Sequence, residues 1–281
     1  MRVLDLQKVT DEVARLCIEA NYFIGKDVLN KLKESQKTET SELGKVILGQ
    51  IIENDEIAAN ESVPMCQDTG LVVVFLEIGT DVKIDGDIYA AVNEGVRLGY
   101  DKGFLRKSVI RHPLDRVNTK DNTPAIIHTK LVPNSDKVKI IVAPKGGGSE
   151  NMSVVKMLKP SDGVEGVKKL VIETIKAAGG NPCPPIVVGV GIGGNLEKSA
   201  QLAKEALLRE IDDHSADPIN ANLEKELLEL VNNTNVGPQG LGGKTTALAV
   251  KVETYPCHFA SLPVAINLNC HAARHKEAVL W

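Results

Sequence analysis

Seven of the eight residues from 71 to 78 are apolar, with three consecutive valines, and this run most strongly limits the folds open to the chain. A short run of this kind is typical of a strand buried on both faces of a sheet. The first sixty residues have helical spacing instead. The sequence therefore predicts a helical N-terminal segment that leads into a buried sheet.

In the N-terminal segment, the first helix is expected to begin at Thr10, a residue type suited to capping a helix N-terminus. Cys17 falls on the apolar stripe of this helix, which predicts a buried, structural cysteine. A second helix is expected at about residues 27–34 and a third through residues 43–51.

Strands and helices then alternate without strict regularity, which predicts a mixed α/β (α+β) fold rather than a doubly wound sheet. Strands are expected at residues 137–142, 186–190, 247–254 and 264–269, and helices at residues 87–98, 163–178, 196–210 and 223–231. A length of 281 residues suits one domain over residues 1–281, or two sub-lobes at about 1–120 and 121–281. The polar stretches 107–123 and 212–218 are candidate hinges.

Composition excludes several classes of protein. A net charge of −4 and 3% aromatic residues argue against nucleic-acid binding. No apolar stretch reaches 18 residues, so no membrane span is expected, and the N-terminus does not resemble a signal peptide. An odd count of five cysteines argues against a disulfide scaffold. These features together predict a cytoplasmic protein with reduced thiols.

Two glycine-rich segments resemble nucleotide-binding loops. Residues 189–194 fit G-x-G-x-x-G between an expected strand and an expected helix, which suits a dinucleotide phosphate or a simple turn. Residues 237–246 imitate a phosphate-binding loop, but Pro238 stands where that motif needs glycine. With residues 145–151, three glycine loops are then available to approach a small ligand.

Three cysteines lie at predicted element ends, where ligands are commonly presented. Cys66 and Cys183 each precede an expected strand, and Cys270 follows one. Three thiolates from three loops can hold one metal site. Since no C-x-x-C pair is present, spacing alone leaves this open.

The sequence resembles the iron–sulfur hydro-lyases, namely the class I fumarases and their L(+)-tartrate dehydratase relatives, from about residue 5 onward. The resemblance is carried by residues 66–70, 145–151, 183–185, 237–245 and 261–264 with Cys270. It matches the α-subunit of the two-subunit form. It implies a [4Fe-4S] cluster on Cys66, Cys183 and Cys270, with one iron left open as a Lewis acid.

The same resemblance implies the roles of further residues. Gln67 and Asp68 would lie beside the cluster, with Asp68 as an acid near the substrate hydroxyl. Arg106 would bind a substrate carboxylate, for which a planar guanidinium is suited. The remaining implied site residues are Gly148 and Asn151, which would touch substrate, and His258, which would lie at the active site.

In this family the catalytic base and further carboxylate-binding residues belong to the C-terminal portion, for which this sequence has no counterpart. The resemblance therefore implies a β-subunit that completes the site, in a hetero-oligomer such as α2β2. The expected reaction is reversible hydration of fumarate to (S)-malate, and dehydration of L-tartrate is the alternative within the class. A nucleotide-binding or regulatory module, and a structural or redox iron–sulfur protein, are the alternatives from other classes.

Overall fold

The structure is a computed structural model that describes residues 2–281, and it contains two compact units. Unit 1 joins the chain up to Ile24 with Asp55–Gly147 and Arg274–Trp281. Unit 2 joins Gly25–Asn54 with Gly148–Ala273. Each unit is therefore built from separate stretches of chain, whereas the sub-lobes expected from the sequence were contiguous.

Neither candidate hinge lies at a junction between the units. Residues 107–123 are an irregular segment inside unit 1, and residues 212–218 lie inside unit 2. Both are polar because they are surface loops, which is the common location of such composition.

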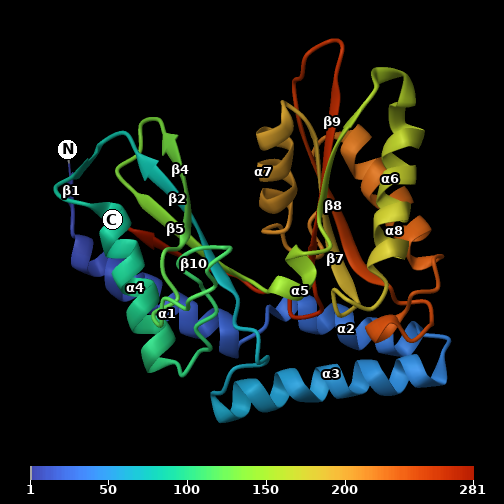
Figure 1. Cartoon of the computed structure of the whole chain (residues 1–281), viewed down its shortest axis with the longest axis horizontal. Helices are drawn as coiled ribbons and strands as arrows, with labels where there is room; N and C mark the ends of the chain where they lie inside the picture. Colours follow the sequence, from blue (N-terminus) through green and yellow to red (C-terminus); the bar gives the residue numbers. More distant parts are fainter. Residues whose placement is uncertain (1) are drawn as a thin grey trace. The chain divides into compact units, whose positions relative to one another are not determined.

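Unit 1 has a four-stranded sheet with two long helices packed against it (Figure 1). Its elements are β1 (Arg2–Leu4), α1 (Leu6–Tyr22), β2 (Leu71–Gly79), β3 (Val82–Ile84), α4 (Ile88–Lys102), β4 (Ile126–Val132), β5 (Val138–Lys145) and β10 (Lys276–Leu280). The sheet order is β10-β5-β2-β4, and only β2 and β4 run parallel. Alternate residues of β2, including Val72, Val74 and Leu76, join α1 and α4 in one core.

The first helix begins earlier than the sequence predicted, so the assignment of Thr10 as its N-cap is wrong. Asp5 is the N-cap, and its carboxylate accepts a hydrogen bond from the Gln7 N–H at 3.0 Å. Thr10 is buried within α1, where its hydroxyl donates to the Ala91 carbonyl at 3.0 Å. Cys17 is fully buried in the same core, and this burial raises the pKa of its thiol.

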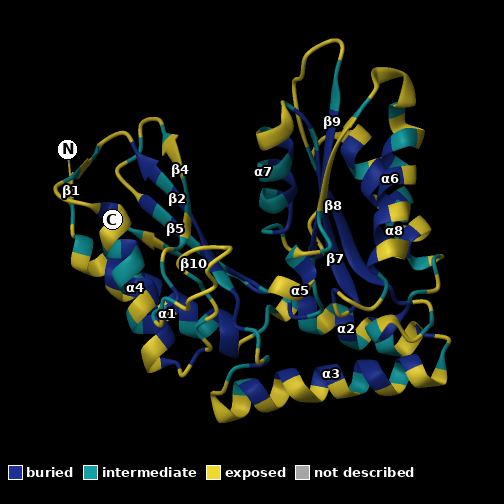
Figure 2. Ribbon diagram, viewed as in Figure 1, coloured by how far each residue is buried: buried dark blue, intermediate teal, exposed yellow. Residues whose placement is uncertain are grey.

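Unit 2 has a second four-stranded sheet, in the order β6-β9-β7-β8, with helices on both faces. Its elements are α2 (Lys26–Thr38), α5 (Gly147–Glu150), β6 (Val154–Leu158), α6 (Gly163–Ala178), β7 (Ile186–Gly193), α7 (Leu196–Ala206), α8 (Pro218–Asn232), β8 (Ala247–Tyr255) and β9 (Leu262–Asn269). The helix α3 (Glu42–Glu61) begins in unit 2 and ends in unit 1. The strands β7, β8 and β9 are buried over most of their length (Figure 2).

The fold is of the α/β class, as the sequence predicted, and the buried strands lie near their expected bounds. The missed strands are β1, β3, β4, β6 and β10, and each is an edge strand of its sheet. All five are short or largely exposed, so they lack the continuous apolar run that reveals a buried strand. Within residues 2–281, no helix has the length and apolar character needed to cross a membrane.

Alternate residues of the strand β7 face the helices on the two sides of the sheet. Val188 and Val190 face the core that contains α6 and α8. Gly189 and Gly191 face α7, where a Cβ would lie 2.1 Å from the Ala203 and Ser199 carbonyl oxygens respectively. The first two glycines of the G-x-G-x-x-G segment therefore allow α7 to approach the sheet closely.

We expect Gly191→Ala to destabilise the chain by roughly 1–3 kcal/mol, because the added methyl group overlaps the Ser199 carbonyl and the packed layers must shift. Urea unfolding measures this loss. The control is Gly242→Ala, where a Cβ meets no atom within 4 Å but φ is +83°. That variant reports the backbone cost of a non-glycine residue, about 1 kcal/mol. Equal stability of Gly191→Ala and the native chain would contradict the packing argument.

Candidate active site

The first predicted site segment is the loop before β2 in unit 1, where Asp68 organises the backbone. One Asp68 carboxylate oxygen accepts from the Gly70 N–H at 3.0 Å, and the other accepts from the Gly147 N–H at 2.8 Å. The Cys66 sulfur accepts from the Asp68 N–H at 3.4 Å, and its thiol lies 3.7 Å from the Gln67 side-chain oxygen. The predicted residues Cys66, Gln67 and Asp68 thus form one hydrogen-bonded group.

Thr69 connects this loop to Arg106. The buried Thr69 hydroxyl donates to the Arg106 carbonyl at 2.8 Å. The Arg106 side chain itself is exposed. The structure therefore brings the Arg106 backbone beside the Cys66 loop and leaves its guanidinium accessible to a ligand.

Three residues that the sequence analysis missed hold the same loop by its carbonyl groups. The buried Arg274 donates to the Asp68 carbonyl at 2.5 Å. Tyr100 donates to the Thr69 carbonyl at 2.6 Å, and burial raises the pKa of its phenol, so it remains a donor. Asn122, fully buried, donates to the Gly70 carbonyl at 3.1 Å. No sequence signal marked these residues, because their partners lie 31 or more positions away in the chain.

Cys183 and Cys270 lie at one end of the unit 2 sheet. Cys183 is in the left-handed region, with φ +56°, just before β7, and Cys270 follows β9 directly. The two strands are antiparallel, and Val187 pairs with Asn269. The His271 N–H donates to the Cys183 carbonyl at 3.2 Å. The structure therefore brings these two cysteine segments together.

The predicted residues Gly148 and Asn151 flank a second group at this end of unit 2. A Cβ on Gly148 would lie 3.2 Å from the Asn181 carbonyl, so this backbone runs close to the Cys183 turn. Asn151 is exposed. Glu150 accepts from Lys204 at 2.8 Å and from Asn267 at 2.7 Å, which ties the helix α5 to β9 three residues before Cys270.

His258 lies at the opposite end of the same sheet. It is exposed in the connection between β8 and β9, where its Nδ1 accepts from the Ala260 N–H at 3.1 Å. The eight residues of β9 separate it from Cys270, which corresponds to about 26 Å at roughly 3.3 Å per residue. Within unit 2 the structure does not bring His258 to the two cysteines.

The glycine-rich loop of residues 237–246 encloses a carboxylate from the chain itself. Glu39 is buried and accepts from the N–H groups of Lys244 at 2.8 Å and Thr245 at 2.7 Å. It also accepts from the Thr40 and Ser41 N–H groups. Burial alone would raise the pKa of Glu39, but these backbone donors outweigh it and lower the pKa to about 2. Glu39 therefore occupies the donors that a phosphate would need.

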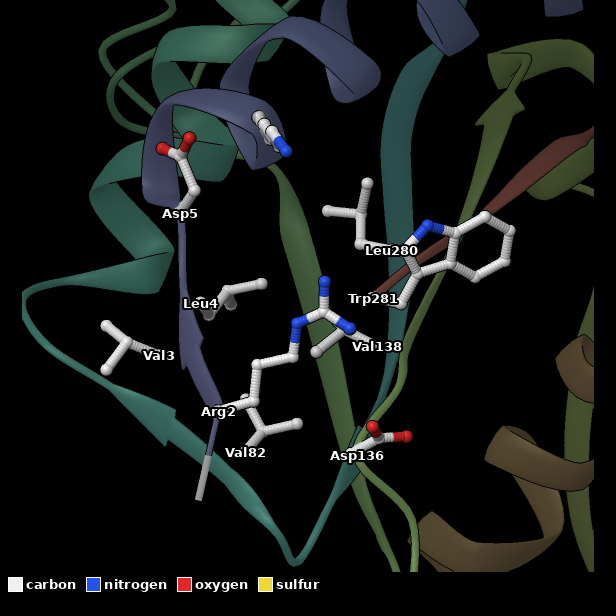
Figure 3. A pocket seen from close by; sticks show the side chains of 10 residues that line it. Arg2, Val3, Leu4, Asp5, Val82, Asp136, Val138, Leu280 and Trp281 are labelled. Atoms are coloured by element: carbon white, nitrogen blue, oxygen red, sulfur yellow. The ribbon is translucent and has the colours of Figure 1, made fainter.

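A pocket of about 100 Å³ lies elsewhere in unit 1 (Figure 3). It is lined by Arg2, Val3, Leu4, Asp5, Lys8, Val82, Asp136, Val138, Leu280 and Trp281. None of the site residues predicted from the sequence lines this pocket. This pocket is therefore no part of the candidate site described above.

The three predicted cluster ligands have suitable donor chemistry. No disulfide joins the five cysteines, all of which lie in the described part of the chain. Cys183 is exposed, and Cys66 and Cys270 are half-buried, in contrast to the fully buried Cys17. Over residues 2–281 no group of three or more His, Cys, Asp and Glu side chains is gathered for a metal ion. Cys66 belongs to unit 1, and the other two ligands belong to unit 2.

Comparison with known proteins places these segments in one family. Residues 10–279 match the family model described as "Fumarate hydratase (Fumerase)". A protein of Methanocaldococcus jannaschii named "Putative L(+)-tartrate dehydratase subunit alpha" is 48% identical over 95% of both chains. The L(+)-tartrate dehydratase subunit alpha of Escherichia coli K12 is 34% identical over 96% of this chain and 89% of its own length. The protein of that name from Shigella boydii has the same identity and coverage.

The protein is thus an enzyme of the hydro-lyase class. The chain belongs to the fumarate hydratase (Fumerase) family, which confirms the family predicted from the cysteine and glycine motifs.

We expect Glu39→Gln to lower the free energy of unfolding at pH 7 by about 3 kcal/mol, the equivalent of moving a pKa from 4.5 to about 2. Because the folded-state pKa is the lower one, this stabilisation is present above pH 4.5 and is lost as the pH falls through about 2. The difference between native chain and variant should therefore narrow over that range. Urea unfolding at several pH values measures it.

The control is Glu42→Gln, an exposed residue paired with Lys45, which should change stability by less than about 0.5 kcal/mol. A Glu39→Gln effect that stays constant from pH 7 to pH 3 would show that the carboxylate charge does not hold this loop.

Proposed function

We propose that the chain is the α-subunit of a hydro-lyase that reversibly adds water to fumarate to give (S)-malate. The observation that carries the proposal is the family match over residues 10–279. The hydrogen-bonded loops around Cys66 and Cys183 support it, because they present thiols and polar groups at element ends.

The proposed cofactor is a [4Fe-4S] cluster held by Cys66, Cys183 and Cys270. Thiolates are the usual ligands of such clusters. Three cysteines leave one of four irons without a protein thiolate, and this iron would supply Lewis acidity toward the substrate hydroxyl and carboxylate.

The chain's own residues would bind and orient the dicarboxylate. The exposed Arg106 guanidinium is suited to a bidentate carboxylate contact. Asp68 is held by the Gly70 and Gly147 N–H groups and would exchange a proton with the departing or entering hydroxyl. We assign contact with substrate also to Gln67, Gly148 and Asn151. The active-site role expected for His258 stays a prediction, because the whole of β9 separates it from Cys270.

A β-subunit would complete the site. No residue of the described loops is assigned as the base that removes the C3 proton of malate, and positioned proton transfer is worth roughly 10²–10⁴-fold. The relatives from E. coli and S. boydii are named as α-subunits, which supports a two-subunit enzyme. We propose a hetero-oligomer such as α2β2 and a reducing, cytoplasmic compartment in which the thiols stay reduced.

Dehydration of L(+)-tartrate is the second candidate, and the names of the relatives favour it. Tartrate differs from malate by one hydroxyl group. A site that hydrogen-bonds a hydroxyl can reject the analogue without it by a large factor. The residues that make this distinction would include those of the β-subunit.

The test is turnover by the anaerobically reconstituted chain, alone and with a β-subunit of the same family. We expect negligible turnover by the α-chain alone and fumarate hydration by the assembled enzyme. Preference for L-tartrate would select the second candidate. Full turnover by the α-chain alone would contradict the division between subunits, and an assembled, cluster-loaded enzyme inactive on both substrates would overturn the proposed function.

A further inference from the structure

We propose that Gln239 is a positioning residue for Cys183, and that Glu39 locks the glycine-rich loop that carries it. The inference concerns the loop of residues 237–246, which none of the roles above uses. It rests on the proposed function in one respect, since Cys183 is a cluster ligand there.

The backbone of the Cys183 turn needs stabilising contacts from other segments of the chain. Cys183 has φ +56°, a region that non-glycine residues adopt at an energetic cost. Such conformations persist where the surroundings fix them, and they are frequent at functional sites. The His271 N–H holds the Cys183 carbonyl at 3.2 Å. The next carbonyl, that of Pro184, is held by Gln239.

Gln239 makes two hydrogen bonds to one acceptor. Its backbone N–H donates to the Pro184 carbonyl at 2.8 Å, and its side-chain amide donates to the same oxygen at 3.0 Å. Gln239 itself has φ +53°, where glycine would be favoured by the backbone. The side-chain amide is therefore the feature that distinguishes glutamine from glycine at this position.

The loop of residues 237–246 packs against the Cys183 turn through close backbone contacts. A Cβ on Gly240 would lie 2.5 Å from the Gly180 Cα, and a Cβ on Gly180 would lie 2.9 Å from the Gln239 carbonyl. The glycines at these two positions therefore allow two backbones to meet. This use differs from the phosphate binding that the sequence pattern imitates.

Glu39 fixes the far side of the loop. Its two oxygens accept from Lys244 and Thr245, and a Cβ on Gly243 would lie 2.9 Å from one of them. The Gly237 N–H is bound by the Thr246 hydroxyl at 3.0 Å. With both ends fixed, the loop can hold Gln239 at a defined distance from Pro184.

The test variant is Gln239→Gly, which keeps the backbone N–H, suits the positive φ and removes the side chain with its donor amide. Its thermal stability should therefore stay near that of the native chain. In the cluster-free chain, hydrogen exchange of the His271 amide should quicken by about three- to tenfold, the effect of one lost hydrogen bond. After anaerobic reconstitution, the variant should lose iron to a ferrous chelator several-fold faster than the native chain.

Two further variants make the result decisive. Gln239→Glu retains size and shape but replaces the donor amide with an acceptor, and it should show the same two changes. Gln201→Ala removes a half-buried glutamine that is bonded to Glu205 on α7, and it should show neither change. Exchange of the Gly147 amide, which is bonded to Asp68 in unit 1, serves as an internal reference.

Unchanged His271 exchange in both Gln239 variants would overturn the proposal. If the native chain binds no cluster while His271 exchange responds as expected, the positioning role stands and the cluster assignment fails. A large loss of thermal stability in Gln239→Gly would show that the side chain supports the unit as a whole rather than the Cys183 turn.

Discussion

The carboxylate of Glu39 meets four backbone N–H groups, and the arrangement of unit 2 around Cys183 depends on this contact. A glycine-rich loop has little preference for one conformation, because glycine restricts its backbone least. The buried charge of Glu39 favours one conformation, since another would remove the Lys244 and Thr245 donors from the carboxylate. The Pro184 carbonyl next to Cys183 is then held by this loop.

In unit 1, the carboxylate of Asp68 fixes the backbone beside a cysteine in a similar way. Asp68 accepts from two backbone N–H groups, while Arg274, Tyr100 and Asn122 donate to the carbonyls of residues 68–70. In both units the cysteine backbone is fixed by hydrogen bonds, whereas the thiols of Cys66 and Cys183 stay accessible. Such preorganised loops suit a cofactor whose ligands come from several segments.

The sequence predicted the parts of the fold that burial controls, such as β2 and the helix α6, because their apolar periodicity is local. The sequence analysis placed the glycine motif of residues 189–194 at a turn between strand and helix, but its first two glycines lie within β7. A glycine that lets a helix pack closely cannot be told in sequence from one that lets a phosphate approach. Glu39 and Arg274 were missed because they bind partners more than 200 residues away. The candidate ligands came from family resemblance, since their spacing has no signature of its own.

The most direct measurement of the central claim is the iron and sulfide content of five single Cys→Ser variants after anaerobic reconstitution. The account predicts that the variants of Cys66, Cys183 and Cys270 each lose the cluster. The variants of the buried Cys17 and of Cys257, which donates to the Ser261 carbonyl, should retain it. A cluster that survives in any of the first three variants, or is lost with Cys257, would contradict the account.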